Sequence, residues 1–111
     1  MSKRNDDLTI QELLGVIANI ESYVIGRTRE HLETEKMLKD AILMSLIVIG
    51  ETTKRLSPET KSMFPDIDWS GITGIRNRIA HGYFDVDLDL VWIVVTVEIP
   101  GLKRVLTKIV K

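Results

Sequence analysis

Apolar residues recur at helical spacing near the start of the chain. From Ile10 they follow one another at three- and four-residue steps as far as Val24, and Gly26 ends the pattern. This spacing is typical of an amphipathic helix that buries one face. Thr9 and Glu12, three residues apart at its start, have the form of a capping box, in which both side chains bond free backbone N–H groups. The sequence therefore predicts a first helix that begins at Thr9.

The second helical pattern covers residues 37–55, and its middle, residues 41–49, is apolar on all sides rather than along one stripe. A helix of this kind is covered on every side. A chain of 111 residues has little material to cover it alone, so the pattern suggests a partner chain. The charged residues 27–36 before it predict a solvent-exposed connection or a short surface helix, and we assign no role to His31.

Local capping signals mark two further helices. Residues 57–59, Ser-Pro-Glu, supply an N-cap, a proline in the first turn and an acid beside it, which predicts a short helix to about residue 64. Asp68 is the best N-cap for a third helix, over residues 69–81, and Gly82 would end it.

The last third of the chain allows two interpretations. Residues 91–97 are rich in β-branched side chains and would suit a strand. Apolar residues nevertheless keep helical spacing from Leu88 to Ile109, and the sequence offers no partner strand elsewhere. We therefore predict a helix capped by Asp87, with a kink or break at Pro100. The fold class that follows is all-α, an up-and-down bundle of four main helices plus short helices, in one domain over residues 1–111.

Composition excludes several classes of protein. The chain has no cysteine, which excludes a disulfide scaffold and thiolate metal sites. Its net charge of -1 argues against a general nucleic-acid binder, so any RNA contact would need a local basic cluster. The first residues lack the apolar core of a signal peptide, and the longest apolar run is far shorter than the roughly 20 residues of a membrane span. We expect a soluble, cytoplasmic protein.

The candidate chemistry lies in residues 76–83, which read Arg-Asn-Arg-Ile-Ala-His-Gly-Tyr. If residues 69–81 form one helix with about 100° per residue, three isoleucines face the core and the side chains of Asn77 and His81 point away from it. Gly71 and Gly74 fall near that polar side, where they would leave room for another surface to approach. This is a second indication of a dimer, with the polar groups near its interface.

These residue types suit metal-independent cleavage of RNA. Arg76 can bind a phosphate through two N–H groups, and His81 can exchange a proton near neutral pH. Asn77 can hold the imidazole or a ribose hydroxyl, and Tyr83 offers a further hydroxyl. No acidic cluster with metal-ligand spacing accompanies them. By spacing alone, a polar helix end with a glycine cap explains the pattern more simply than catalysis does.

Residues 76–83 also match the R-x4-H-x-Y motif, and the chain resembles the HepT-like toxins of the HEPN superfamily. The likeness extends to residues 49–57, 65–69 and 81–92, and covers roughly residues 8–110. The resemblance implies an all-α bundle that forms a homodimer with its motif helices at the interface. It also implies a toxin of a type VII toxin–antitoxin system that is coded beside a minimal nucleotidyltransferase (MNT) antitoxin.

The same resemblance assigns roles to single residues. Arg76 and His81 would be the catalytic residues of an endoribonuclease that uses neither metal nor cofactor. In the family the residue after the arginine is often polar, and Asn77 would support the two catalytic residues. As a separate prediction of our own, Glu51 would orient Arg76 across the bundle. Tyr83 would receive AMP from the nucleotidyltransferase, which silences the toxin. The alternative is a non-catalytic module that binds a nucleotide or a partner protein.

Overall fold

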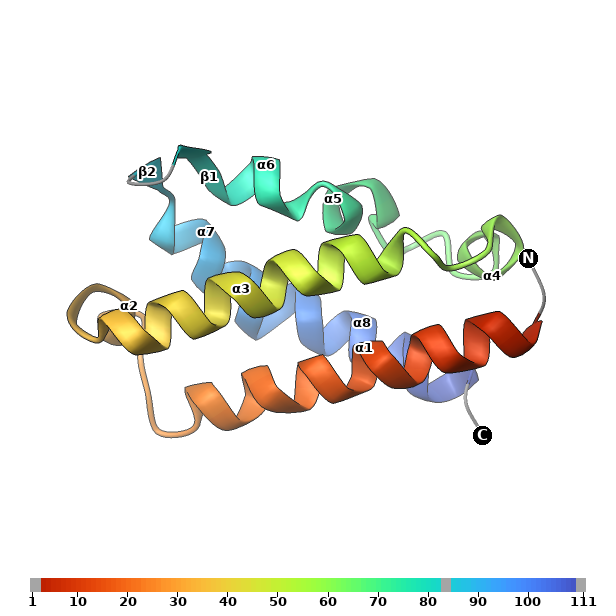
Figure 1. Cartoon of the computed structure of the whole chain (residues 1–111), viewed down its shortest axis with the longest axis horizontal. Coiled ribbons are helices and arrows are strands. Elements are labelled where there is room, and N and C mark those ends of the chain that lie inside the picture. The colour runs from red at the N-terminus through yellow and green to blue at the C-terminus, as the bar shows by residue number, and fades with distance from the viewer. Residues whose placement is uncertain (1–2, 83–84, 110–111) are drawn as a thin grey trace.

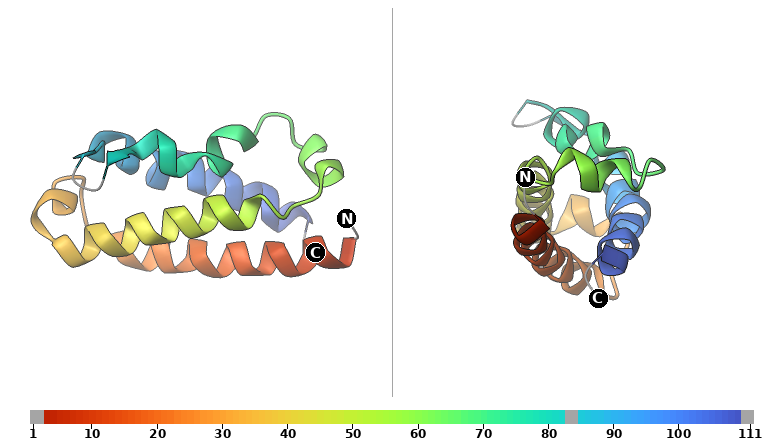
Figure 2. Two further views of the ribbon diagram at one scale, coloured as in Figure 1. Left: turned by 45° about the horizontal axis from the view of Figure 1, so that its top comes forward. Right: turned by 90° about the vertical axis from the view of Figure 1, so that its right-hand side faces the viewer.

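The fold is mostly helical and is built around two long antiparallel helices. The computed structural model describes residues 3–82 and 85–109 (Figure 1). Helix α1 (Lys3–Val24) and helix α3 (Lys36–Thr53) pack side by side along the length of the molecule, and α8 (Ile99–Ile109) lies against α1. The end-on view of Figure 2 shows the helices arranged around a common interior.

Shorter elements complete the chain. They are α2 (His31–Thr34), α4 (Pro58–Ser62), α5 (Trp69–Thr73), α6 (Ile75–Ile79), β1 (Ala80–Gly82), β2 (Asp85–Val86), α7 (Leu88–Ile93) and the π-helical turn η1 (Val94–Glu98). Helices α5 and α6 pack against α3 and occupy the place of a fourth long helix. The predicted predominance of helix is confirmed, but in the described part of the chain one of the four expected main helices is replaced by these two short ones.

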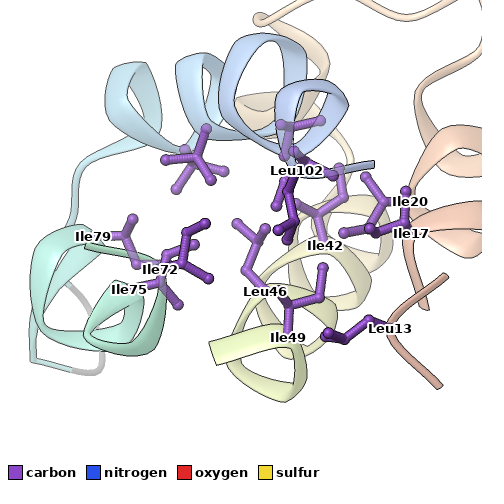
Figure 3. Close-up of a cluster of buried hydrophobic side chains, with 14 of the residues drawn as sticks. Leu13, Ile17, Ile20, Ile42, Leu46, Ile49, Ile72, Ile75, Ile79 and Leu102 are labelled. Atoms are coloured by element: carbon purple, nitrogen blue, oxygen red, sulfur yellow. The ribbon is translucent and has the colours of Figure 1, made fainter. Parts of the chain in front are cut away.

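The core is aliphatic and joins every long helix. Figure 3 shows side chains of α1, α3 and the α5–α6 segment converging with Leu102 of α8. The most deeply buried side chains, each with at most 1% of its surface exposed, include Leu13, Ile17, Ile42, Leu46, Ile75 and Leu102. Full burial of such a side chain stabilises the fold by about 1.5–3 kcal/mol.

The first helix begins earlier than its sequence pattern predicts. Helix α1 starts at Lys3, and Thr9 is buried inside it, so the prediction of a capping box at Thr9 is wrong. The extra turns are held by Asp6, whose buried carboxylate accepts hydrogen bonds from the backbone N–H of Ser57 at 3.0 Å and from its hydroxyl at 2.6 Å. This tie connects the start of α1 to the cap of α4.

The predicted second helix is confirmed to within two residues at each end. Its apolar residues are not all covered within one chain. Ile42, Leu46 and Ile49 are buried, whereas Met44 keeps 61% and Val48 keeps 37% of its surface exposed. The covering partner that this helix suggested therefore stays a prediction.

The predicted continuous helix over residues 69–81 is wrong. Gly74 separates α5 from α6, and α6 ends at Ile79 because Ala80 takes an extended conformation (φ -140°, ψ 129°) and begins β1. Strand β1 pairs antiparallel with β2, and the N–H of Asp87 bonds the carbonyl oxygen of Ile79 at 2.8 Å. The helix thus ends three residues before Gly82, where a strand pairing takes over its backbone hydrogen bonds.

Three local caps are confirmed. Ser57, Asp68 and Asp87 each accept a hydrogen bond from a backbone N–H of the helix that follows, as predicted. The charged connection contains one short helix, α2, which buries Leu32.

The chain is helical rather than extended from Leu88 to Ile109, which confirms the helical interpretation of its β-branched residues. No break occurs at Pro100, since α8 runs through it from Ile99. The irregular turn is the π-helical η1, which ends two residues before Pro100. Proline lacks an N–H and crowds the carbonyl four residues earlier, which here belongs to Thr96 within η1. Among residues 3–82 and 85–109, no helix has the length and apolarity needed to cross a membrane.

Candidate active site

A cleft of about 730 Å³ separates the first half of α3 from the α6–β1 segment. One wall comes from α3, and the opposite wall comes from α6, the two short strands and the start of α7. The lining residues are Lys36, Lys39, Asp40, Leu43, Met44, Ile47, Arg76, Asn77, Ile79, Ala80, Gly82, Val86 and Leu88. Both walls carry apolar and charged residues.

Arg76 and Asn77 reach this cleft because of the way α6 is anchored. Ile75 and Ile79 are each 1% exposed and fix the buried side of α6, so the two residues that follow Ile75 are exposed. Arg76 and Asn77 both line the cleft, and neither side chain has a hydrogen bond or ion pair with any residue that the structure describes. The guanidinium of Arg76 is therefore available to an anionic ligand.

The α3 wall adds charges that the sequence pattern did not single out. Lys36 donates to the carboxylate of Asp40 at 2.6 Å, one turn along the helix. Lys39 is only partly exposed and lines the same cleft. Together with Arg76, these lining residues carry three positive charges against one negative charge. The cleft is thus locally basic in a chain whose net charge is -1.

Arg78, the second arginine of the motif, has a structural contact. Its guanidinium donates to the two carboxylate oxygens of Glu98 in η1, at 2.8 and 2.9 Å, and approaches the carbonyl oxygen of Gly71 at 3.4 Å. The hydrogen bonds from Arg78 to Glu98 raise the pKa of Arg78 above its ordinary value. This two-pronged ion pair links α6 to the π-helical turn. The arginine at position 78 is explained by Glu98, which lies 20 residues further along the chain.

The glycines near the site serve packing within the chain. A β-carbon on Gly71 would collide with the carboxylate of Asp68, the residue that caps α5. A β-carbon on Gly50 of α3 would lie 3.0 Å from the carbonyl oxygen of Ile72. Gly71 therefore makes room for the cap and for Arg78, which differs from the expectation that it makes room for a second chain. Gly50, which the sequence did not single out, lets α3 approach α5 closely.

His81 lies in β1 rather than on a helix. The predicted helical i, i+4 relation between Asn77 and His81 is therefore wrong. Ala80 and Gly82, on either side of His81, both line the cleft, so the backbone of His81 passes along it. The side chain of His81 and the whole of Tyr83 lie outside the described part of the structure.

Glu51 lies on the exposed side of α3. Its carboxylate accepts a hydrogen bond from Lys54 at 3.0 Å, and it makes no contact with Arg76 within the described residues. No described contact supports the orienting role predicted for Glu51. Across residues 3–82 and 85–109, no group of three or more histidine, aspartate and glutamate side chains is placed to hold a metal ion.

Comparison with known proteins places the chain in a family. The family model for HepT-like ribonucleases matches residues 13–109. Two similar proteins come from Methanocaldococcus jannaschii: "Gamma-glutamylcyclotransferase and putative RNase MJ0434", 32% identical over 98% of this chain, and "Putative RNase MJ0125", 30% identical over 100% of this chain and 96% of the relative. The chain spans about half, 49%, of the first of these relatives.

A third relative is "Probable ribonuclease HepT" of Thermococcus cleftensis, which is 28% identical over 98% of this chain and 99% of the relative. No solved structure matches the chain. The family match begins at residue 13, within α1, and runs to the end of α8, so it includes the two walls of the cleft. The chain belongs to the HepT-like ribonuclease family.

Proposed function

We propose that this protein is a metal-independent endoribonuclease that acts as the toxin of a type VII toxin–antitoxin system. The observation that carries the proposal is Arg76, an exposed guanidinium without a described partner in a basic cleft of a HepT-like chain. Arginine binds phosphate through paired N–H groups, and in a cleft it stabilises the charge that develops on a phosphoryl group during transfer.

The proposed reaction is transesterification within the RNA strand. The ribose 2′ oxygen forms a bond to phosphorus while the bond from phosphorus to the 5′ oxygen breaks. The proton of the 2′ hydroxyl passes to a base, and an acid gives a proton to the leaving 5′ oxygen. His81 serves these proton transfers because an imidazole titrates near neutral pH. The products carry a 2′,3′-cyclic phosphate and a 5′ hydroxyl, and no metal ion takes part.

Two proton transfers and one motif histidine per chain favour a homodimer. A two-fold axis beside the motif segment would bring two copies of His81 to one interface. Met44 lines the cleft and is 61% exposed, and Val48, one turn further along α3, is also exposed. A second copy packed on this side would cover both side chains, which supports a homodimer through the motif face.

The activity test is RNA cleavage by the purified protein in EDTA. Wild type should cleave and leave cyclic phosphate ends, and His81→Ala and Arg76→Ala should lose at least about a hundredfold in rate. Arg104→Ala is the matched control, because Arg104 is an exposed arginine on α8 outside the cleft lining. If both motif variants cleave as fast as Arg104→Ala, the proposed catalytic roles are wrong.

The partner that we propose is an MNT-like nucleotidyltransferase antitoxin. The hydroxyl of Tyr83 would attack the α-phosphate of ATP, with pyrophosphate as the leaving group, so that Tyr83 carries AMP. A bulky phosphoester two residues from His81 would block access of RNA to the motif. Incubation with the cognate enzyme and ATP should add the mass of AMP to the Tyr83 peptide and to no peptide of Tyr83→Phe.

The second candidate function is a non-catalytic module that binds a nucleotide or a partner protein. It is favoured by the low overall charge of -1, which gives long-range attraction to RNA little support. In that case the purified protein would bind its partner tightly and leave RNA intact in the cleavage assay. Asn77→Ala would then change affinity for the bound nucleotide or partner without any effect on an RNA product.

A further inference from the structure

Lys39 is a basic residue of the cleft whose role the motif does not explain. It lies on α3, whereas Arg76 lies on α6, so the two cations belong to opposite walls of one cleft. They are 37 positions apart in the sequence, and packing of α6 beside α3 brings their walls together. No short-range pattern could connect them.

The neighbouring charges leave Lys39 uncompensated. Asp40 is the acidic residue among the described lining residues, and its carboxylate accepts a hydrogen bond from Lys36 at 2.6 Å. The side chain of Lys39 has no hydrogen bond or ion pair with a described residue, although it is only partly exposed. A lysine that is partly withdrawn from water without a counterion favours binding of an anion at that place.

A ligand with more than one negative charge suits two such cations. A phosphate held by Arg76 supplies one negative charge, and the positive charge of Lys39 on the opposite wall favours a second phosphate beside it. A single-stranded nucleic acid presents phosphates at each nucleotide, so one strand can satisfy both walls at once. The cleft, at about 730 Å³, is within the range of sites that enclose a drug-sized ligand, and a short nucleotide segment is of that order.

We infer that Lys39 binds a phosphate next to the one that is cleaved, so that a single RNA strand crosses the cleft from α6 to α3 and needs at least two consecutive phosphates. This inference rests on the proposed ribonuclease function and names the substrate contact on the wall opposite Arg76. Lys39 binds substrate in this scheme, while the reacting phosphate stays with Arg76.

The first measurement is the salt dependence of binding to a short single-stranded RNA. Each lost phosphate contact lowers the slope of log K against log salt by about 0.7 for a single strand. The comparison is made in a His81→Ala background, where raising the salt from about 50 to about 200 mM weakens RNA binding. That loss of affinity should be about 2.5-fold smaller when Lys39→Gln is added than in the parent. Lys39→Arg should restore the parent slope because it keeps the charge.

The matched control is Lys54→Gln, at the end of the same helix. Lys54 donates to Glu51 and does not line the cleft, so its loss should leave the slope unchanged. Thermal melting of each variant checks that the fold is intact. Because Lys39→Arg keeps the charge and approximate length of the side chain, a slope difference between it and Lys39→Gln reports a phosphate contact rather than a folding defect.

The second measurement separates the two phosphates. A dinucleoside monophosphate contains only the reacting phosphate, so Lys39→Gln and wild type should cleave it equally well. A longer RNA should show a raised KM and an unchanged kcat in Lys39→Gln. An equal loss on both substrates would overturn the inference.

Failure of this inference can be told apart from failure of the proposed function. If wild type cleaves RNA and Lys39→Gln keeps both the slope and the KM, the contact is absent while the nuclease stands. If wild type leaves RNA intact but the slope still falls in Lys39→Gln, the phosphate contact stands without the nuclease. An unchanged slope combined with weaker binding of the nucleotidyltransferase would assign Lys39 to the protein partner and overturn the inference.

Discussion

Arg78 and Glu98 form a two-pronged ion pair that joins the motif helix to a π-helical turn. The guanidinium donates to the two carboxylate oxygens at 2.8 and 2.9 Å, and each side chain is less than a third exposed. Helix α6 has only five residues, too few for a stable helix by itself. It keeps its place through buried Ile75 and Ile79 and through this pair, and the direction of Arg76 depends on that placement.

Removal of one partner of this pair should destabilise the protein. A hydrogen bond to a charged group contributes about 1.5–3 kcal/mol where it is shielded, and partial exposure brings the expected loss to about 1–2 kcal/mol for Arg78→Ala or Glu98→Ala. Urea denaturation of both variants and of the double variant gives the coupling free energy. If the two losses simply add, the contact contributes nothing and the anchoring role is wrong.

Two glycines in long helices should respond differently to alanine. Nothing lies within 4 Å of a β-carbon at Gly15 in α1, so Gly15→Ala should gain about 1 kcal/mol from helix propensity. At Gly50 the same β-carbon would meet the backbone oxygen of Ile72 at 3.0 Å and a methyl of Ile75 at 3.1 Å. Gly50→Ala should therefore lose that gain or become less stable than wild type.

The measurement for the glycines is the melting temperature of the two variants beside wild type. An equal rise in both variants would show that α5 and α6 do not press closely on α3. In that case Gly50 would not set the distance between α3 and the α5–α6 segment.

Asp6 should make stability depend on acidic pH. Burial by itself would raise the pKa of Asp6, but hydrogen bonds from Ser57 and Thr60 outweigh it and hold that pKa below its ordinary value of 3.8. Above that value the carboxylate is ionised in both states and its full contribution is present. As the pH falls below it, the unfolded chain takes up the proton first, so stability is lost until the folded-state pKa is passed.

The comparison for Asp6 is with Asp6→Asn, which lacks the titrating group. Wild type should be more stable at neutral pH, and the difference between the two should shrink as the pH falls from about 5 to about 3. Urea midpoints at several pH values measure it. A difference that stays constant across this range would mean that the buried hydrogen bonds do not require the ionised form.

The features that the sequence predicts well are those set by residues a few positions apart. Capping by Ser57, Asp68 and Asp87 depends on the next turn of chain, and the three-residue spacing of Ile72 and Ile75 shows which side is buried. The same patterns predicted the helical state of the β-branched residues before Pro100, because the spacing extended over several turns.

The features that the sequence misses are set by partners far along the chain. Helix α1 gains its first turns from the bond between Asp6 and Ser57, which are 51 residues apart. Helix α6 ends at Ile79 because β1 finds its pairing partner in β2, which no helical pattern reveals. Lys39 reads as one more charge near a surface helix until α6 packs opposite it. For the site, the sequence alone makes Arg76 a candidate for phosphate binding, whereas it gives no sign of the opposite wall of the cleft.

Arg76 and Arg78, two residues apart, should respond to substitution in opposite ways. Arg76 is exposed and has no described partner, so Arg76→Ala should change the free energy of unfolding by no more than about 0.5 kcal/mol. Loss of its charge at the reacting phosphate should still lower the rate of RNA cleavage by about 10²–10³-fold. Arg78→Ala should lose both stability and activity, because α6 is released from Glu98.

Urea denaturation and initial cleavage rates in EDTA, measured on the same preparations, distinguish the effect of each arginine on stability from its effect on activity. A folded Arg76→Ala protein with full activity, or an Arg76→Ala protein as destabilised as Arg78→Ala, would show that the two arginines do not divide chemistry and anchoring as we propose.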